Sequence, residues 1–102
     1  MAKLIRQEPE DKFNEERYYW LVAERFEVIV YMGNSNSSFF ISDKKNEMNS
    51  SELTIKIANE LQLYDEEVKI IPSIDTCGIT VPKSHNDRIF KFIENYLLEL
   101  IK

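Results

Sequence analysis

The apolar positions of the chain are densest between Tyr18 and Met32, where twelve of fifteen residues are hydrophobic. This block holds the only tryptophan and three of the five tyrosines. From residue 26 the side chains alternate, with Phe26, Val28, Val30 and Met32 on one face and Glu27, Ile29 and Tyr31 on the other. Such period-two alternation is typical of a β-strand. Because both faces are mostly apolar, the pattern predicts a strand within a sheet that is covered on both sides.

Residues 9–24 fit either a helix or a strand. Pro9 is followed by two acidic residues, which is typical of a helix start. Four residues would lie on one stripe of that helix, namely Phe13, Arg17, Trp20 and Leu21. The segment 18–22, however, is aromatic and β-branched enough to form a strand. The pattern favours a short helix from about Pro9 that is followed by a strand.

A first hairpin and a helix are predicted in the middle of the chain. The polar residues 33–38 separate the first strand from the strand-like run 39–41, so the two runs should form an antiparallel hairpin. Asn49 and Glu52 have the spacing of a capping box, and apolar residues then recur at four-residue intervals. These features predict a helix from about Ser50 to Leu63.

A second hairpin and a final helix follow. Residues 68–71 and 79–81 are the predicted strands, and Gly78 in the turn between them is able to adopt a positive φ. Ser84 and Asp87 are spaced to cap a helix that continues to the end of the chain. Its apolar residues span an arc of roughly 180°, against about 100° for one core face. The sheet would cover one side of this arc, and the first helix or a second subunit would cover the other.

Together these elements predict an α+β fold, with a small antiparallel sheet of four to five strands in two hairpins. Two to three helices pack on the sheet, the last of them a long amphipathic C-terminal helix. The 102 residues should form one domain, with residues 1–8 as a candidate flexible segment. No stretch matches a motif of a known family. The element order and the acidity are similar to the layout of small secretion-chaperone-like domains, which favours a binding role and assigns no site.

The formal net charge of −5 is distributed unevenly along the chain. Residues 1–25 carry −1, residues 26–67 carry −5 and residues 68–102 carry +1. A phosphate backbone is bound by clustered lysine and arginine, so this balance opposes direct binding of nucleic acid or of an anionic membrane. The acidic middle third favours a protein partner with a basic surface.

The residue types limit the chemistry further. A single cysteine, Cys77, and a single histidine, His85, exclude an intramolecular disulfide and a structural zinc site, and we expect no cofactor. No apolar run approaches the roughly 18 residues of a membrane span. The N-terminal residues lack the apolar core of an export signal, so we expect a cytoplasmic protein.

One pair of residues could supply a thiol nucleophile and a base, namely Cys77 and His85, with Asp75 or Asp87 orienting the imidazole. An extended strand lies between them in the predicted fold. At about 3.3 Å per residue, that strand would hold the two side chains more than about 13 Å apart. Such a separation is beyond hydrogen-bond reach, and we therefore expect no catalytic dyad.

Two groups of residues are candidates for partner binding. The first group consists of the aromatic residues Tyr19, Trp20 and Tyr31. Tyrosine and tryptophan are enriched in the hot spots of protein interfaces. The second group consists of the adjacent carboxylates Asp65, Glu66 and Glu67. Because no apolar residues are interleaved with these carboxylates, docking to lysine or arginine suits them better than acid–base catalysis.

The sequence thus favours a small, acidic, non-enzymatic protein-interaction domain of the inhibitor, immunity, adaptor or chaperone type. Such a domain binds and modulates a partner protein, and it would be a monomer or a homodimer. Two alternatives stay open. One is a small-molecule-binding or thiol-dependent enzyme domain that uses the turn from Asp75 to Cys77. The other is an acidic nucleic-acid mimic that blocks a DNA- or RNA-binding protein.

Overall fold

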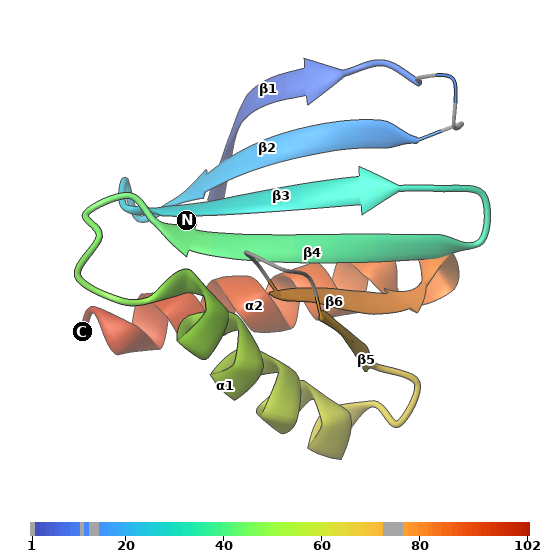
Figure 1. The fold of residues 1–102 in the computed structure, drawn as a ribbon. Helices are drawn as coiled ribbons and strands as arrows, with labels where there is room; N and C mark the ends of the chain where they lie inside the picture. The colour runs from blue at the N-terminus through green and yellow to red at the C-terminus, as the bar shows by residue number, and fades with distance from the viewer. Residues whose placement is uncertain (1, 11, 13–14, 73–76) are drawn as a thin grey trace.

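The computed structural model describes residues 2–10, 12, 15–72 and 77–102, which form an α+β fold with one six-stranded antiparallel sheet (Figure 1). The elements in chain order are β1 (Ala2–Glu8), β2 (Glu16–Val22), β3 (Phe26–Met32), β4 (Asn36–Asp43), α1 (Ser50–Tyr64), β5 (Lys69–Pro72), β6 (Cys77–Pro82), a 3₁₀ turn (Lys83–His85) and α2 (Asn86–Leu100). The strands lie side by side in the order β1-β2-β3-β4-β6-β5. The predicted fold class is confirmed, but the described residues form six strands rather than four to five.

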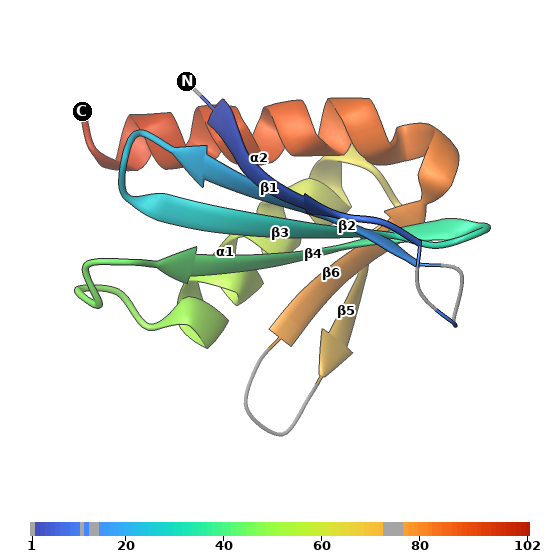
Figure 2. The same ribbon diagram turned by 90° about the horizontal axis from the view of Figure 1, so that it is seen from above.

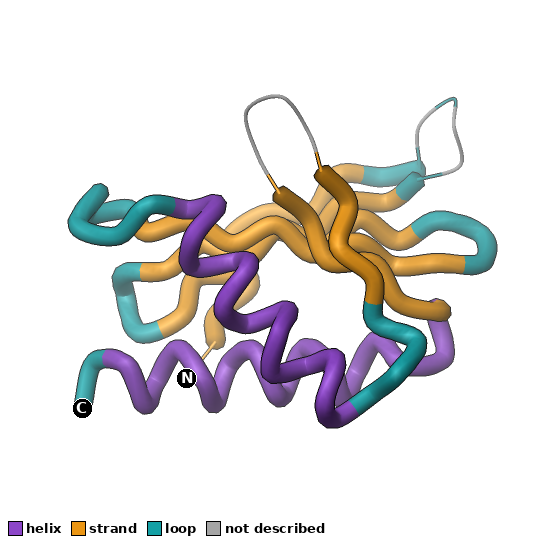
Figure 3. The backbone as a smooth tube through the Cα atoms, turned by 60° about the horizontal axis from the view of Figure 1, so that its bottom comes forward, coloured by secondary structure: helices purple, strands orange, loops and turns teal. Residues whose placement is uncertain are grey.

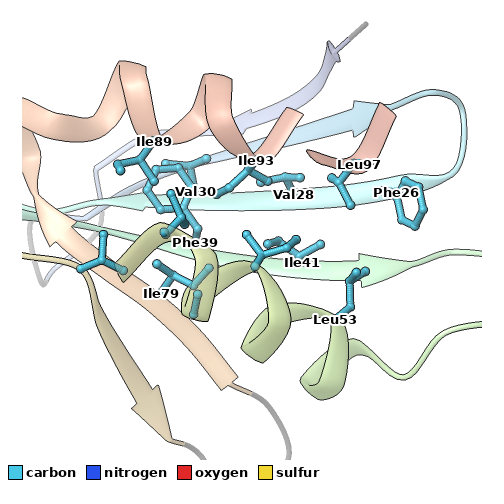
Figure 4. Packing of buried hydrophobic residues seen from close by; sticks show 14 of the residues in the cluster. Phe26, Val28, Val30, Phe39, Ile41, Leu53, Ile79, Ile89, Ile93 and Leu97 are labelled. Carbon is cyan, nitrogen blue, oxygen red and sulfur yellow. The ribbon is translucent and has the colours of Figure 1, made fainter. Parts of the chain in front are cut away.

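One face of the sheet forms the core together with both helices. Val30 of β3 lies opposite Phe39 of β4, and both side chains are buried. The helices complete this core with Leu53, Ile57, Ala58 and Leu61 of α1 and Ile89, Ile93 and Leu97 of α2 (Figure 4). Figure 2 shows α2 running along the sheet, and Figure 3 shows the C-terminal end of α1 beside α2.

The predicted N-terminal helix is wrong. Pro9 lies in the connection between β1 and β2, which pair with each other in antiparallel fashion. The candidate flexible segment 1–8 supplies β1 from Ala2 onward. Along β2 the large side chains alternate, so that Trp20 faces the helices and Tyr19 faces away from them. A strand in the sheet pairs its backbone groups on both sides and packs aromatic residues on both faces, and this tertiary pairing outweighs the helix-start pattern at Pro9.

The first hairpin and α1 confirm their predictions. The strand β3 has the predicted bounds and the predicted alternation of buried and half-buried side chains. The turn after it is shorter than expected, because the Gly33 N–H donates to the Asn36 carbonyl oxygen at 3.0 Å and β4 begins at Asn36. Asn49 caps α1, since its Oδ1 accepts the Glu52 N–H at 3.0 Å.

Two details of the C-terminal half differ from prediction. Gly78 lies within β6 and has no positive φ. Glycine leaves space there for the ring of Phe40, because a Cβ atom would come within 2.7 Å of that ring unless the ring shifted. Ser84 lies inside the 3₁₀ turn and does not cap α2. The Asn86 N–H donates to the Lys83 carbonyl oxygen, so the 3₁₀ turn supplies acceptors that a side-chain cap would otherwise provide.

The wide apolar arc of α2 is covered from two sides. The ring of Phe90 lies 5.1 Å from that of Trp20 in the sheet, and the ring of Phe92 lies 5.4 Å from that of Tyr64 at the end of α1. The sheet and α1 therefore share the arc. The second side of the arc is therefore covered by α1 and not by an N-terminal helix.

Candidate functional site

The face of the sheet that points away from both helices carries half-buried apolar side chains, and no helix of the described residues covers it. Tyr19, Ile29 and Phe40 lie opposite one another on β2, β3 and β4. The ring of Tyr31 lies 5.1 Å from that of Phe40 at an angle of 44°. The predicted N-terminal helix therefore does not cover this face, and its covering by a partner stays a prediction. We call these residues, together with the other outward-facing side chains of the six strands, the open face.

Two arginines lie over the tyrosine rings of the open face. The guanidinium carbon of Arg6 is 3.8 Å from the centre of the Tyr19 ring, and that of Arg17 is 5.2 Å from the centre of the Tyr31 ring. Glu8 accepts a hydrogen bond from the Tyr19 hydroxyl, which raises the pKa of Tyr19 and keeps the phenol neutral. Arg6 Nη2 also lies 3.8 Å from Glu8 Oε1, so the guanidinium, the phenol and the carboxylate form one cluster.

The open face differs in charge from the chain as a whole. According to the strand register, its cationic residues are Lys3, Arg6, Arg17 and Lys69. Its carboxylates are Glu8 and Glu27. With four cations against two carboxylates, this surface is net positive on a protein of net charge −5.

Trp20 belongs to a different surface from Tyr19 and Tyr31, because neighbouring residues in a strand point to opposite faces. It lies on the helix side and lines a cleft of about 350 Å³ between β2, β3 and the start of α2. The full lining is Tyr18, Trp20, Val30, Met32, Asn86, Asp87 and Phe90. The three aromatic candidates are thus divided between the open face and this cleft, which we call the α2 cleft.

Asp65, one of the candidate docking carboxylates, is buried and engaged by three groups. Its Oδ1 accepts the Glu67 backbone N–H at 3.0 Å. Its Oδ2 lies 2.7 Å from His85 Nδ1 and 2.5 Å from Arg88 Nη2. These contacts join the end of α1 to the start of α2 and leave the Asp65 carboxylate less accessible to a partner than its neighbours. Glu66 and Glu67 are exposed and accessible to a partner.

The same cluster does not have the arrangement of a catalytic triad. Nδ1 of His85 faces Asp65, and its Nε2 lies 3.7 Å from Glu67 Oε1, so both ring nitrogens face carboxylates. Cys77 begins β6 and His85 follows the end of that strand, as the sequence predicted. Asp75 lies outside the described residues. Within the described ranges, no group of three or more histidine, cysteine or acidic side chains is placed to hold a metal ion.

Asp65 should make the stability of the protein depend on pH. The Glu67 N–H, Arg88 and His85 lower the pKa of Asp65 below its ordinary value of 3.8, although burial opposes this shift. A carboxylate with a lowered pKa stabilises the folded state above its ordinary pKa and loses that contribution as the pH falls through the folded value. We expect Asp65→Asn to lower the unfolding midpoint by roughly 5–10 °C at pH 7, and by progressively less below about pH 4.

Thermal unfolding of the wild type and Asp65→Asn between pH 7 and pH 3, followed by circular dichroism, measures this difference. Glu66→Gln is the matched control, because it removes the neighbouring exposed carboxylate. Its midpoint should stay within about 2 °C of the wild type at each pH. A deficit of Asp65→Asn that is equal at pH 7 and pH 3 would show that the charge of Asp65 is not the stabilising feature.

Arg6 and Phe40 were missed as functional candidates at the level of sequence, and Arg17 was not assigned to one surface with Tyr19. Arg17 and Tyr19 are separated by one residue, so the alternation of a strand places them on one face. The helix predicted over this segment concealed that relation. Arg6 was missed because the N-terminal residues were treated as a flexible segment rather than as a strand.

Comparison of the chain with protein-family models, with curated proteins and with solved structures gives no match. In the part of the chain that the structure describes, neither helix is long and apolar enough to cross a membrane.

Proposed function

We propose that the protein is a small non-enzymatic interaction domain that binds and modulates a partner protein through the open face. The main support is the stacking of Arg6 on Tyr19 and of Arg17 on Tyr31, on a sheet face without a covering layer of described residues. Tyrosine and arginine are the residue types that dominate binding energy at protein interfaces. A sheet ordinarily buries its apolar side chains beneath another layer. A half-buried aromatic face without that layer is suited to a partner.

The charge of the open face suggests the chemistry of the partner. Ile29 and Phe40 lie on the central strands, whereas Lys3 and Lys69 lie on the outer strands β1 and β5. A complementary surface would be apolar at its centre and acidic at its rim, rather than basic as the net charge of the whole chain suggested. Cations at the rim would then steer an acidic partner toward the face and raise the association rate.

Ile29→Asp tests this proposal, because it places a charge at the centre of the apolar surface. The Ile29 side chain is only half-buried, so we expect the fold to survive. We expect the affinity for the partner to fall at least about thirty-fold, which corresponds to the loss of a hot-spot contact of about 2 kcal/mol. Affinity capture from cell lysate, identification of the captured protein and titration of that protein measure the change.

Leu63→Asp is the matched control, since Leu63 is 92 % exposed on α1 and lies outside the open face. A protein captured by the wild type and Leu63→Asp, but not by Ile29→Asp, would support the proposal. Equal capture by all three proteins would place the binding site elsewhere, and capture by none would contradict an interaction domain. A single-stranded oligonucleotide that binds the open face with steep salt dependence would also contradict it.

Light scattering of the same three proteins tests self-association. A homodimer that Ile29→Asp dissociates and Leu63→Asp preserves would identify a second copy of the chain as the partner of the open face. Because the open face is net positive, two copies of it would repel each other, so we expect a monomer in this measurement.

A further inference from the structure

We infer that the α2 cleft binds an ammonium or guanidinium group that carries a short apolar stem. The cleft lies on the helix side of the sheet, whereas the open face lies on the other side. The inference therefore does not rest on the proposed function, and the two can be tested separately.

The walls of the α2 cleft are aromatic. Tyr18 and Trp20 come from β2, and Phe90 comes from the first turns of α2. The rings of Trp20 and Phe90 lie 5.1 Å apart and are tilted by 56°, so they form two sides of one angular wall. Aromatic faces attract organic cations through the ring quadrupole. Met32 and Val30 add apolar surface for the stem of such a ligand.

Two polar residues, Asn86 and Asp87, also line the cleft. The Asn86 Oδ1 atom is buried and has no hydrogen-bond partner. Asp87 lies beside it on the lining and forms no ion pair with any described residue. No lysine or arginine is among the lining residues. The positive charge of a ligand would be paired with the exposed Asp87 carboxylate.

The start of α2 does not reverse this preference for a cation. The N-terminus of a helix ordinarily attracts anions. Here the 3₁₀ turn precedes α2 without a break, and the Asn86 N–H already donates to the Lys83 carbonyl oxygen. The positive end of the helical stretch therefore lies at Lys83, before the residues of the cleft. Asp87 adds a full negative charge, against about half a charge from the dipole.

The size of the α2 cleft limits the ligand. A volume of about 350 Å³ is at the small end of the range for ligand sites. It accommodates one cationic group and a stem of a few carbon atoms. Both a free small amine and the arginine or lysine side chain of a bound protein have this chemistry.

Trp20 is the only tryptophan of the chain and lines the cleft, so its fluorescence reports binding directly. Butylguanidinium is the probe, and butylurea is its uncharged analogue of similar shape and similar N–H donors. We expect a saturable change in Trp20 emission with butylguanidinium and at least tenfold weaker binding of butylurea. N-acetyl-arginine amide distinguishes a free small amine from an arginine side chain of a bound protein. Binding at least as tight as that of butylguanidinium would indicate a protein side chain, and weaker binding would indicate a free small molecule.

Asp87→Asn should weaken the binding of butylguanidinium at least fivefold. Glu99→Gln is the matched control, because it removes the same charge near the other end of α2 and should leave the affinity unchanged. Equal affinity for butylguanidinium and butylurea, equal loss in both variants, or the absence of a saturable change would overturn the inference. Ile29→Asp on the open face should leave the titration unchanged, so failure of the proposed function is distinguishable from failure here.

Discussion

Asp43→Ala should lower the midpoint of thermal unfolding by more than about 10 °C, which would be the largest effect of a single charge removal in this protein. Asp43 is buried at the end of β4 and its carboxylate accepts five hydrogen bonds in the described structure. Arg25 donates two of them, from Nε at 3.0 Å and from Nη2 at 2.9 Å. The others come from the backbone N–H groups of Lys45, Glu47 and Met48, at 3.0, 3.1 and 3.0 Å.

Alanine would leave all of these donors without their acceptor. The Arg25 guanidinium would lose its buried counter-charge, and three N–H groups of the loop between β4 and α1 would lose their partner. The Arg25 guanidinium, helped by the N–H groups of Lys45 and Met48, holds the pKa of Asp43 well below its usual range despite burial. The Asp43 carboxylate therefore makes its full contribution to the stability of the folded state above its ordinary pKa. It loses this contribution only as the pH falls well below about 4.

Glu47→Ala is the control for Asp43→Ala, because Glu47 also pairs with Arg25, at 3.1 Å, but is mostly exposed. An exposed ion pair contributes little, so we expect a change of less than about 5 °C. Circular dichroism at pH 7 gives both midpoints. If the two variants lost the same stability, burial and the backbone donors would not be the reason for the importance of Asp43.

Phe39→Ala should lower the free energy of unfolding by about 3–5 kcal/mol. Phe39 is fully buried, pairs with Val30 on one side and Ile79 on the other, and packs beneath the helices (Figure 4). Removing the ring leaves a cavity at the place where the sheet, α1 and α2 meet. Because close-packed interiors relax only partly, the surrounding side chains would not fill that space. Denaturation with urea, at unchanged m-value, measures the loss.

Phe40→Ala is the matched control for this change, with the same residue type one position later on the opposite face. Its ring is half-buried on the open face, so we expect a loss of about 1 kcal/mol or less. Under the proposed function, Phe40→Ala should instead weaken partner binding. If Phe40→Ala destabilised the protein as strongly as Phe39→Ala, the open face would be part of the core rather than a surface.

Several elements could be predicted because their causes lie within a few residues. Asn49 accepts the N–H of Glu52 inside one helical turn, and the helix of α1 follows with its apolar stripe. The alternation of β3 is a property of that strand alone, so its buried residues were identified from their order in the chain. The separation of Cys77 from His85 followed from the length of one strand.

The N-terminal segment could not be predicted in this way. Pro9 and the acidic residues after it have the pattern of a helix start, and within that segment only the aromatic and β-branched run 18–22 favours a strand. β1 and β2 form because each pairs with a neighbouring strand, and β2 must also pair with β3 on its other side. Strand pairing joins residues that are distant in sequence, and a local pattern does not record it.

For the candidate sites as well, some features follow from the local sequence and others only from long-range pairing of the strands. Local pattern was sufficient to select Tyr19, Trp20 and Tyr31 as aromatic candidates, because residue type alone suggested them. Long-range pairing was needed to place Tyr19 and Tyr31 under arginines on the open face and Trp20 in the α2 cleft. It also buried Asp65 and left its neighbour Glu66 exposed. The physical reason is that burial and ionic pairing depend on which elements meet, and both helices of this protein pack on one face of the sheet and leave the other open.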